Sequence, residues 1–200
     1  MSGGVAGGHG QPGPLCRFRY AAGCMLASSN LFLVGPMGSG KSAVGKQLSR
    51  LLRRPFYDSD LEIERRCGVD IPFIFEKEGE TGFRQRETET LQVLVGMERI
   101  VMATGGGAIL RADNRRLLSE HGCVIYLKTS VAQQVERVRQ GRARPLLSNV
   151  DPTVKLQALM EIRAPLYTEV ADITVVTDNR RVRHVAEDIL RELDATGMGR

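Results

Sequence analysis

A glycine-rich segment between an apolar run and an amphipathic run constrains the fold of this chain more than any other feature. Gly35–Ser42 has the sequence GPMGSGKS, which fits the pattern G-x-x-x-x-G-K-[ST]. The apolar run Leu31–Val34 before it predicts a short buried strand, and Ala43–Leu52 after it has apolar residues at a helical spacing. Such a loop turns backbone N–H groups inward at a helix N-terminus, an arrangement that binds phosphate. The segment therefore predicts a P-loop that binds a nucleoside triphosphate; the alternative is a glycine-rich turn that matches by chance.

The residues of this loop have separate expected roles in nucleotide binding. The ammonium group of Lys41 would lie between the outer phosphates, and the hydroxyl of Ser42 would coordinate Mg²⁺. Backbone N–H groups would bind the remaining phosphate oxygens, and the residues expected to take part are Gly38, Ser39, Gly40 and Ala43.

Length and composition limit the class of protein and its partners. The 200 residues suffice for one domain with a substantial core, and no apolar run approaches the ~20 residues that span a bilayer. The net charge of +5 could indicate nucleic-acid binding, but the arginines form no basic tract. A site for two anionic substrates needs positive charge in any case, so we expect neither nucleic acid nor membrane as a partner. No C-x-x-C pair occurs, which favours free thiols in a cytoplasmic protein for Cys16, Cys24, Cys67 and Cys123.

The first 29 residues differ from the rest of the chain. Ser2–Pro14 is rich in glycine and proline and has no apolar periodicity, which predicts a disordered N-terminal extension. The extension lacks the apolar core of a signal peptide and has too few arginines for a transit peptide. Met25 lies just ahead of the first predicted strand, so it is a second candidate for the natural start.

Beyond the extension, apolar runs alternate with amphipathic segments. The runs expected to form strands are Leu31–Val34, Phe56-Tyr57, Ile100–Ala103, Val124–Leu127 and Ile173–Val176. Alternating strands and helices around a P-loop predict an α/β fold, with a parallel sheet covered by helices on both faces. Right-handed crossovers then gather ligands at the carboxyl ends of the strands. The remaining catalytic and ligand-binding residues should therefore lie just after the ends of the predicted strands.

Two aspartates follow the short strand Phe56-Tyr57, in the tripeptide Asp58-Ser59-Asp60. If the chain is still extended there, the two carboxylates share one face of the strand. One could then help to hold hydrated Mg²⁺, and the other could take a proton from an acceptor hydroxyl. The alternative is that Asp60 caps the helical segment Leu61–Cys67. The tripeptide alone leaves both interpretations open.

Three glycines, Gly105–Gly107, follow the predicted strand Ile100–Ala103 and are expected at the same edge of the sheet. Their N–H groups could bind an anion, although a flexible turn has the same composition. Arg84 lies in a helical segment, and its planar guanidinium suits a carboxylate. A solvated surface arginine is the alternative, and an intrahelical pair with Glu87 could orient Arg84.

An arginine-dense segment lies between two later helical runs and contains Arg137, Arg139, Arg142 and Arg144, followed by Pro145-Leu146-Leu147. This composition suits a lid that closes over phosphates and contributes an arginine to the transition state. A mobile loop with solvated charges is the alternative. Farther along, Arg163–Tyr167 comes at the end of a predicted helix, where Pro165 predicts a kink or a break.

In this order, the motifs resemble those of the shikimate kinases, small P-loop enzymes that phosphorylate the 3-hydroxyl of shikimate with ATP and Mg²⁺. The resemblance covers residues 30–193. A P-loop occurs in many families, whereas its combination with the other motifs is specific to this one. These motifs are Asp58-Ser59-Asp60, Phe83-Arg84 with Glu87, Gly105-Gly106-Gly107, Arg144-Pro145-Leu146-Leu147 and Arg163-Ala164-Pro165-Leu166-Tyr167.

The resemblance implies an α/β, three-layer P-loop NTPase fold similar to that of nucleoside monophosphate kinases. A five-stranded parallel sheet would be flanked by helices, with a substrate-binding helical region at 58–96 and an arginine-bearing lid at 139–150. The expected organisation is one kinase domain, 30–194, after a disordered extension, 1–29, and before a C-terminal tail, 195–200.

For the nucleotide, the resemblance implies that Lys41 and the loop amides hold the phosphates while Ser42 binds Mg²⁺ directly. Asp58 would act on the metal through water. Arg144 would close with the lid onto the transferring phosphate, so that it and Lys41 are expected catalytic cations. Arg137 matches the position of an arginine that packs on adenine in relatives.

For the acceptor, the resemblance implies a site for a hydroxylated carboxylate. Asp60 would bind the acceptor hydroxyls and is the expected general base. Arg84 and Arg163 would bind the shikimate carboxylate together with the backbone of Gly106 and Gly107.

The implied activity is that of a phosphotransferase with an alcohol group as acceptor, in the chorismate pathway to aromatic amino acids. ATP and shikimate would be its ligands and Mg²⁺ its cofactor, in a cytoplasmic monomer. A kinase for another small hydroxylated acid, such as gluconate, is the nearest alternative, because the same fold hosts such activities. A non-catalytic ATP-binding switch is an alternative of another class. The sequence argues against it, because it has both the carboxylate expected to act on the metal, Asp58, and the carboxylate expected to act as the base, Asp60.

Overall fold

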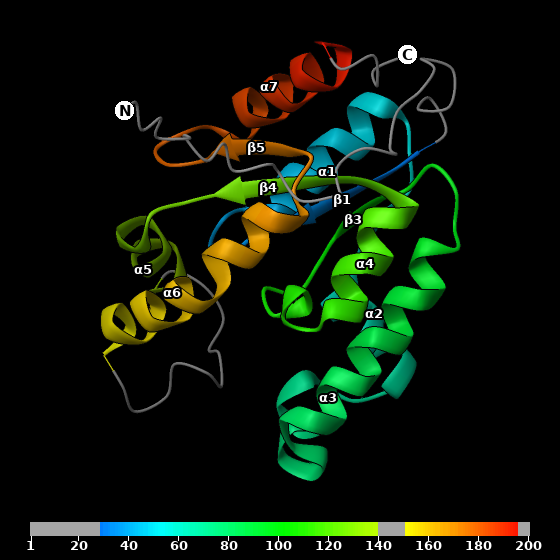
Figure 1. The fold of residues 1–200 in the computed structure, drawn as a ribbon, viewed down its shortest axis with the longest axis vertical. Coiled ribbons are helices and arrows are strands. Elements are labelled where there is room, and N and C mark those ends of the chain that lie inside the picture. The colour runs from blue at the N-terminus through cyan, green and yellow to red at the C-terminus, as the bar shows by residue number, and fades with distance from the viewer. Residues whose placement is uncertain (1–28, 140–150, 196–200) are drawn as a thin grey trace, which may run out of the picture.

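A parallel sheet of five strands forms the centre of the computed structural model, which describes residues 29–139 and 151–195. The strands lie in the order β2-β3-β1-β4-β5, and every pairing is parallel. Their bounds are β1 Asn30–Val34, β2 Phe56–Asp58, β3 Val101–Ala103, β4 Gly122–Lys128 and β5 Ile173–Val176 (Figure 1). The five predicted strands are thus confirmed, with ends displaced by at most two residues.

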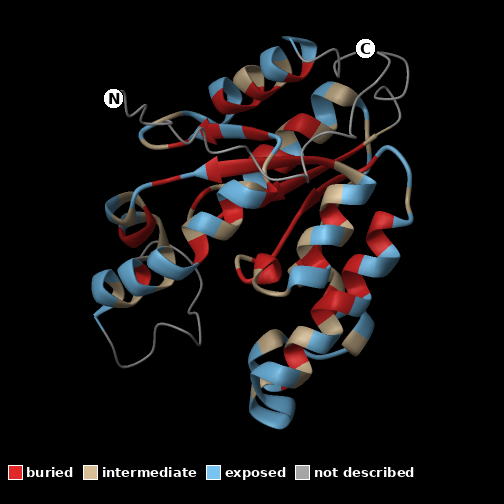
Figure 2. Ribbon diagram, viewed as in Figure 1, coloured by how far each residue is buried: buried red, intermediate tan, exposed pale blue. Residues whose placement is uncertain are grey.

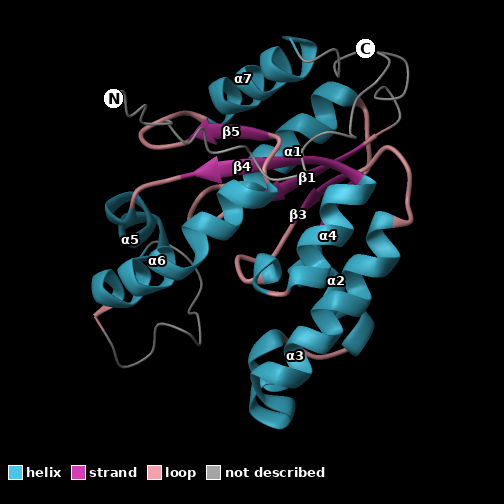
Figure 3. Cartoon of the chain, viewed as in Figure 1, coloured by secondary structure: helices cyan, strands magenta, loops and turns pink. Residues whose placement is uncertain are grey.

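Helices connect the strands and cover both faces of the sheet, as Figure 3 shows. Their bounds are α1 Lys41–Leu52, α2 Ser59–Cys67, α3 Ile71–Val95, α4 Ala112–His121, α5 Val131–Arg139, α6 Pro152–Val170 and α7 Val182–Ala195, with a short 3₁₀ helix, η3, at Ala108–Leu110. The α/β fold with three layers is therefore confirmed. Within the described residues, no helix combines the length and the apolarity that crossing a membrane requires.

The hydrophobic core has two layers because side chains alternate along each strand. In β1, Leu31 and Leu33 pack with residues of α1 and α7, such as Leu48 and Ile189. The intervening Phe32 packs on the other face with residues of α3, α4 and α6. Figure 2 shows buried residues along the sheet and along the helix sides that face it. Burial on both faces explains why the central strands β1, β3 and β4 are almost continuous apolar runs in the sequence.

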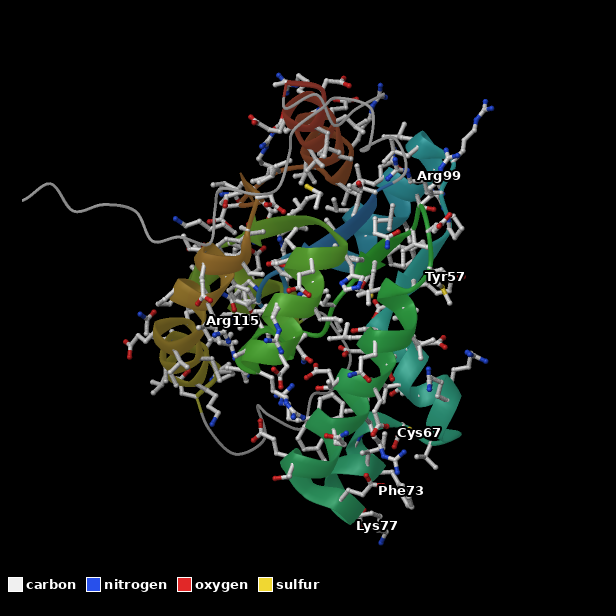
Figure 4. The ribbon with its side chains drawn as sticks, turned by 45° about the vertical axis from the view of Figure 1, so that its right-hand side comes forward. Tyr57, Cys67, Phe73, Lys77, Arg99 and Arg115 are labelled. Atoms are coloured by element: carbon white, nitrogen blue, oxygen red, sulfur yellow. The ribbon has the colours of Figure 1, made fainter. Side chains whose placement is uncertain are left out.

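Helices α2 and α3 extend away from the sheet and have a small core of their own, formed by Ile63, Ile74 and Phe83. Helix α3 turns at Gly79, which has φ 65° and ψ −171°, a backbone geometry that favours glycine. Figure 4 shows Cys67, Phe73 and Lys77 at the far end of this region, with Arg99 at the opposite end of the molecule. The region corresponds to the segment 58–96 that was expected to bind substrate.

The structure corrects one expectation, about Pro165, and several others concern residues that it does not describe. Helix α6 continues through Pro165 to Val170, so the prediction that the helix breaks at Pro165 is wrong. A proline removes one backbone hydrogen bond, and the buried side chains of Tyr167 and Val170 still pack beyond it. The extension 1–28, the tail residues 196–200 and the lid residues 140–150, with Arg144, lie outside the described residues.

Candidate active site

The P-loop joins β1 to α1 and has a backbone that only glycine adopts readily. Gly35, Gly38 and Gly40 have φ values of 143°, 78° and 90°. A Cβ at Gly35 would also lie 2.6 Å from the carbonyl oxygen of Leu127. The Nζ of Lys41 donates to the carbonyl oxygens of Gly35 and Pro36, both at 2.8 Å. The ammonium group is therefore held over the loop, where phosphates would bind.

The two aspartates lie beside this loop, and the extended conformation ends at Asp58 instead of continuing to Asp60. The chain becomes helical at Ser59, so Asp58 caps α2 by accepting from the backbone N of Asp60 at 3.2 Å. The prediction that Asp60 caps this helix is wrong, as is the premise that the chain is still extended there. The other carboxylate oxygen of Asp58 accepts from the Oγ of Ser42 at 2.6 Å. Asp60 lies in the first turn of α2.

The pair of Ser42 and Asp58 fits Mg²⁺ in its donor chemistry. Magnesium prefers oxygen ligands and keeps several waters, so one or two protein ligands suffice beside substrate phosphates. A hydroxyl and a carboxylate oxygen 2.6 Å apart at the mouth of the P-loop supply such a pair. Among residues 29–139 and 151–195, no group of three His, Cys, Asp or Glu side chains could hold a metal by itself.

Two adjoining cavities lie at the carboxyl edge of the sheet. One, of about 270 Å³, is lined by the P-loop, the two aspartates and Arg137, and the other, of about 460 Å³, lies between the sheet edge and helices α2 and α3. Five residues line both: Met37, Ser42, Asp58, Asp60 and Gly106. A nucleotide phosphate in the smaller cavity would therefore meet an acceptor in the larger one beside the two aspartates.

The expected general base lies against the glycine turn. A Cβ added at Gly105 would lie 2.5 Å from the Oδ1 of Asp60 and 3.0 Å from the Oε1 of Glu87. The backbone N of Gly105 donates to the Oγ of Ser59 at 2.9 Å, which ties the turn to α2. Because Gly105 has no side chain, the carboxylate of Asp60 can approach the turn between the two cavities.

Arg84 is held between two glutamates of its own helix. Its Nη1 donates to the Oε2 of Glu87 at 2.7 Å, and its Nε and Nη2 contact Glu80 at 3.3 and 3.1 Å. Glu87 is 1% exposed, and burial raises the pKa of its carboxyl while the charge of Arg84 opposes the rise. The predicted pair of Arg84 and Glu87 is thus present, and it orients the guanidinium toward Gly107.

Arg163 approaches the glycine turn from α6. It is 6% exposed, and its Nη1 lies 3.5 Å from the carbonyl oxygen of Gly106. Arg84 and Arg163 both line the larger cavity, with Gly106 and Gly107. The structure therefore brings together all the residues that were expected to bind a carboxylate.

Arg137 lines the smaller cavity and contacts backbone on two sides of it. Its guanidinium donates to the carbonyl oxygens of Gly38 at 2.9 Å and of Thr177 at 2.8 Å. Arg137 thereby joins the P-loop to the end of β5. Packing of its flat face on adenine stays a prediction.

Several residues of the larger cavity were not expected from the sequence. An apolar wall is formed by Leu61, Ile71, Pro72, Phe75 and Phe83, and the rings of Phe75 and Phe83 stack with centroids 4.7 Å apart. Lys46 and Glu64 also line it. In the sequence, the helical spacing of these apolar residues indicates only a packed core. Nothing in the pattern distinguishes residues that line a cavity from residues that pack in the core.

A model of the family described as shikimate kinase matches residues 37–194. The chain belongs to the shikimate kinase family. A shikimate kinase of Thioalkalivibrio sulfidiphilus is 53% identical over 167 residues, which cover 84% of this chain and 88% of the relative. One of Pseudomonas putida is 53% identical over 164 residues, covering 82% and 95%. The solved structure of the shikimate kinase from Acinetobacter baumannii in complex with shikimate has a TM-score of 0.81 and 50% identity, covering 84% of this chain and 93% of that one.

Proposed function

We propose that this chain transfers the γ-phosphoryl group of ATP to the 3-hydroxyl of shikimate, giving ADP and shikimate 3-phosphate for aromatic amino acid synthesis. The observation that carries this proposal is the meeting of the two cavities at Asp58 and Asp60. One cavity has a phosphate-binding loop, and the other has two arginines beside a glycine turn. A phosphate donor and a carboxylate acceptor would each meet groups of opposite charge.

On the nucleotide side, catalysis is expected to consist of positioning and charge neutralisation. Lys41 would exchange its two carbonyl acceptors in the P-loop for phosphate oxygens. Ser42 and Asp58 would hold Mg²⁺, whose chemistry is to neutralise charge on the transferring phosphate. Arg144, which lies outside the described residues, is proposed to close over the same phosphate.

On the acceptor side, Asp60 is proposed as the base for the attacking hydroxyl. Its carboxylate lines both cavities, so it can reach an acceptor hydroxyl that faces a nucleotide phosphate. Arg84 and Arg163 would bind the carboxylate at the other end of the acceptor, with the N–H groups of the glycine turn. The apolar wall would then contact the ring carbons.

We further propose a cytoplasmic monomer that binds neither nucleic acid nor membrane, with residues 30–194 as one domain. Among the described residues, neither Cys67 nor Cys123 forms a disulfide. Size-exclusion chromatography with light scattering would test the monomer, and a dimeric mass would contradict it.

The proposed activity is tested by ADP release with Mg²⁺-ATP and a panel of acceptors. We expect ADP only with shikimate, with an equal amount of shikimate 3-phosphate by mass spectrometry, and no turnover when EDTA removes the metal. Gluconate and nucleoside monophosphates are the comparison acceptors. ADP formed only with one of these would overturn the carboxylate assignment, and ATP binding without turnover would favour the nucleotide switch.

A further inference from the structure

Tyr167 lies directly behind the glycine turn. It ends the motif Arg163–Tyr167, in which only Arg163 has been given a role so far. It is on α6, one helical turn beyond Arg163, and its side chain is fully buried. Its hydroxyl donates to the carbonyl oxygen of Gly106 at 2.5 Å. Burial raises the pKa of this phenol well above its usual value, so the hydroxyl stays protonated and can act as a donor.

The ring of Tyr167 is also held in place, by stacking on a second tyrosine. It stacks on the ring of Tyr126 in β4, with centroids 5.0 Å apart and planes at 21°. Tyr126 belongs to β4, so the stacked pair connects the glycine turn to the central sheet. The hydroxyl of Tyr126 is buried and has no hydrogen-bond partner among the described residues.

Because the peptide bond between Gly106 and Gly107 is planar, fixing the carbonyl of Gly106 also fixes a group that faces the larger cavity. No peptide bond between described residues is cis, so the carbonyl of Gly106 and the N–H of Gly107 point in opposite directions. A donor that fixes the carbonyl from the core side therefore fixes the direction of that N–H. Gly107 faces Arg84, because a Cβ there would lie 2.5 Å from both terminal nitrogens of the guanidinium.

The same carbonyl also links Tyr167 to Arg163. The Nη1 of Arg163 lies 3.5 Å from the oxygen of Gly106, whereas the hydroxyl of Tyr167 lies at 2.5 Å. The carbonyl is therefore satisfied mainly by the phenol, and the contact that Arg163 makes with it is the longer of the two. Without the phenol, Arg163 would be the remaining donor for this partly buried oxygen.

We propose that Tyr167 is a positioning residue for the carboxylate end of the acceptor. It aims the N–H of Gly107 into the larger cavity and, by donating to the carbonyl of Gly106 itself, limits Arg163 to a long contact of 3.5 Å with that oxygen. This inference rests on the proposed function, since the carboxylate that it concerns is that of shikimate. Tyr167 does not touch the reacting atoms, so its effect falls on acceptor binding and not on the nucleotide.

The test is Tyr167→Phe, with Tyr126→Phe as the matched control. Both substitutions remove one buried hydroxyl from the same stacked pair, but only the first removes a hydrogen bond. For Tyr167→Phe we expect the KM for shikimate to rise about tenfold, because Arg163 would donate to the carbonyl of Gly106 and lose about one hydrogen bond to the acceptor carboxylate. The KM for ATP should stay within about twofold of wild type, and Tyr126→Phe should leave both constants unchanged.

Two further measurements make the outcome decisive. Titration of shikimate into each protein without nucleotide should show the same weakening of Kd, and thermal unfolding should show both variants folded. An unchanged KM and Kd for shikimate in folded Tyr167→Phe would overturn the inference, as would an equal rise in the KM values of both substrates. If wild type neither binds nor phosphorylates shikimate, the proposed function fails before Tyr167 is tested.

Discussion

Gly107 is one of two glycines of the turn that a side chain proposed to bind substrate approaches closely, the other being Gly105. A Cβ at this position would lie 2.5 Å from both terminal nitrogens of Arg84 and 2.7 Å from its Cζ. Gly107 has φ −100° and ψ −2°, a negative-φ conformation that is allowed for alanine. In Gly107→Ala, the guanidinium must therefore retreat by about 0.9 Å to reach the 3.4 Å at which ordinary contact begins.

The size of the effect follows from what this retreat breaks. The 2.7 Å bond from Arg84 to Glu87 and the proposed contact with the acceptor carboxylate both depend on the present position of the guanidinium. A hydrogen bond to a charged group is worth about 1.5–3 kcal/mol, so the KM for shikimate should rise about 10- to 150-fold. Arg84 moves at the end of a flexible side chain, so Tm should fall by no more than about 4 °C.

The assay is ADP release at saturating Mg²⁺-ATP with shikimate varied, together with thermal unfolding. Gly96→Ala is the control, because Gly96 has φ −73° and ψ −8°, and its added Cβ would come no closer than 3.4 Å to another atom. A KM for shikimate equal to wild type in Gly107→Ala would refute the placement of Arg84 at the acceptor carboxylate. An equal rise in Gly96→Ala would show a general effect of the added methyl group.

Three other substitutions test separate parts of the site. Asp60→Asn should lower kcat by roughly 10²–10⁴-fold, the usual range for a general base, while the Kd for ATP is retained; near-normal turnover would remove Asp60 from that role. Arg84→Lys should raise the KM for shikimate, because a point charge cannot replace a planar fork, and an unchanged KM would exclude Arg84 from the carboxylate site. Burial raises the pKa of Glu87 above 4.5, so the folded state holds this proton more tightly than the unfolded state. Wild type should therefore lose stability relative to Glu87→Gln as pH rises from about 4.5 through the raised pKa, as measured by urea unfolding, and parallel pH profiles would contradict this.

The sheet and the P-loop could be predicted from local sequence because their signals are local. A strand buried on both faces is a continuous apolar run, and the central strands β1, β3 and β4 have that composition over most of their length. The positive φ values of Gly35, Gly38 and Gly40 explain the glycine spacing that identified the loop. The edge at which ligands gather follows from parallel connectivity, which is why Asp58 and Gly105–Gly107 could be placed together.

The helix boundaries and supporting contacts could not be predicted in the same way. Asp58 and Asp60 have the same side chain, and which of them caps α2 depends on where β2 ends against β3. Glu80 pairs with Arg84 because α3 turns at Gly79 and starts a new segment there. The contact of Tyr167 with Gly106 joins residues 61 positions apart, so only the folded chain shows it.

The carboxylate site is tested most directly by comparing shikimate with its carboxamide at saturating Mg²⁺-ATP. The carboxamide keeps the ring and its hydroxyls but lacks the charge that Arg84 and Arg163 would bind. Each charge-assisted contact is worth about 1.5–3 kcal/mol, so kcat/KM should fall by roughly 10²–10⁴-fold for the carboxamide. Equal values of kcat/KM for the two acceptors would contradict the account, because the paired arginines would then have no carboxylate to recognise.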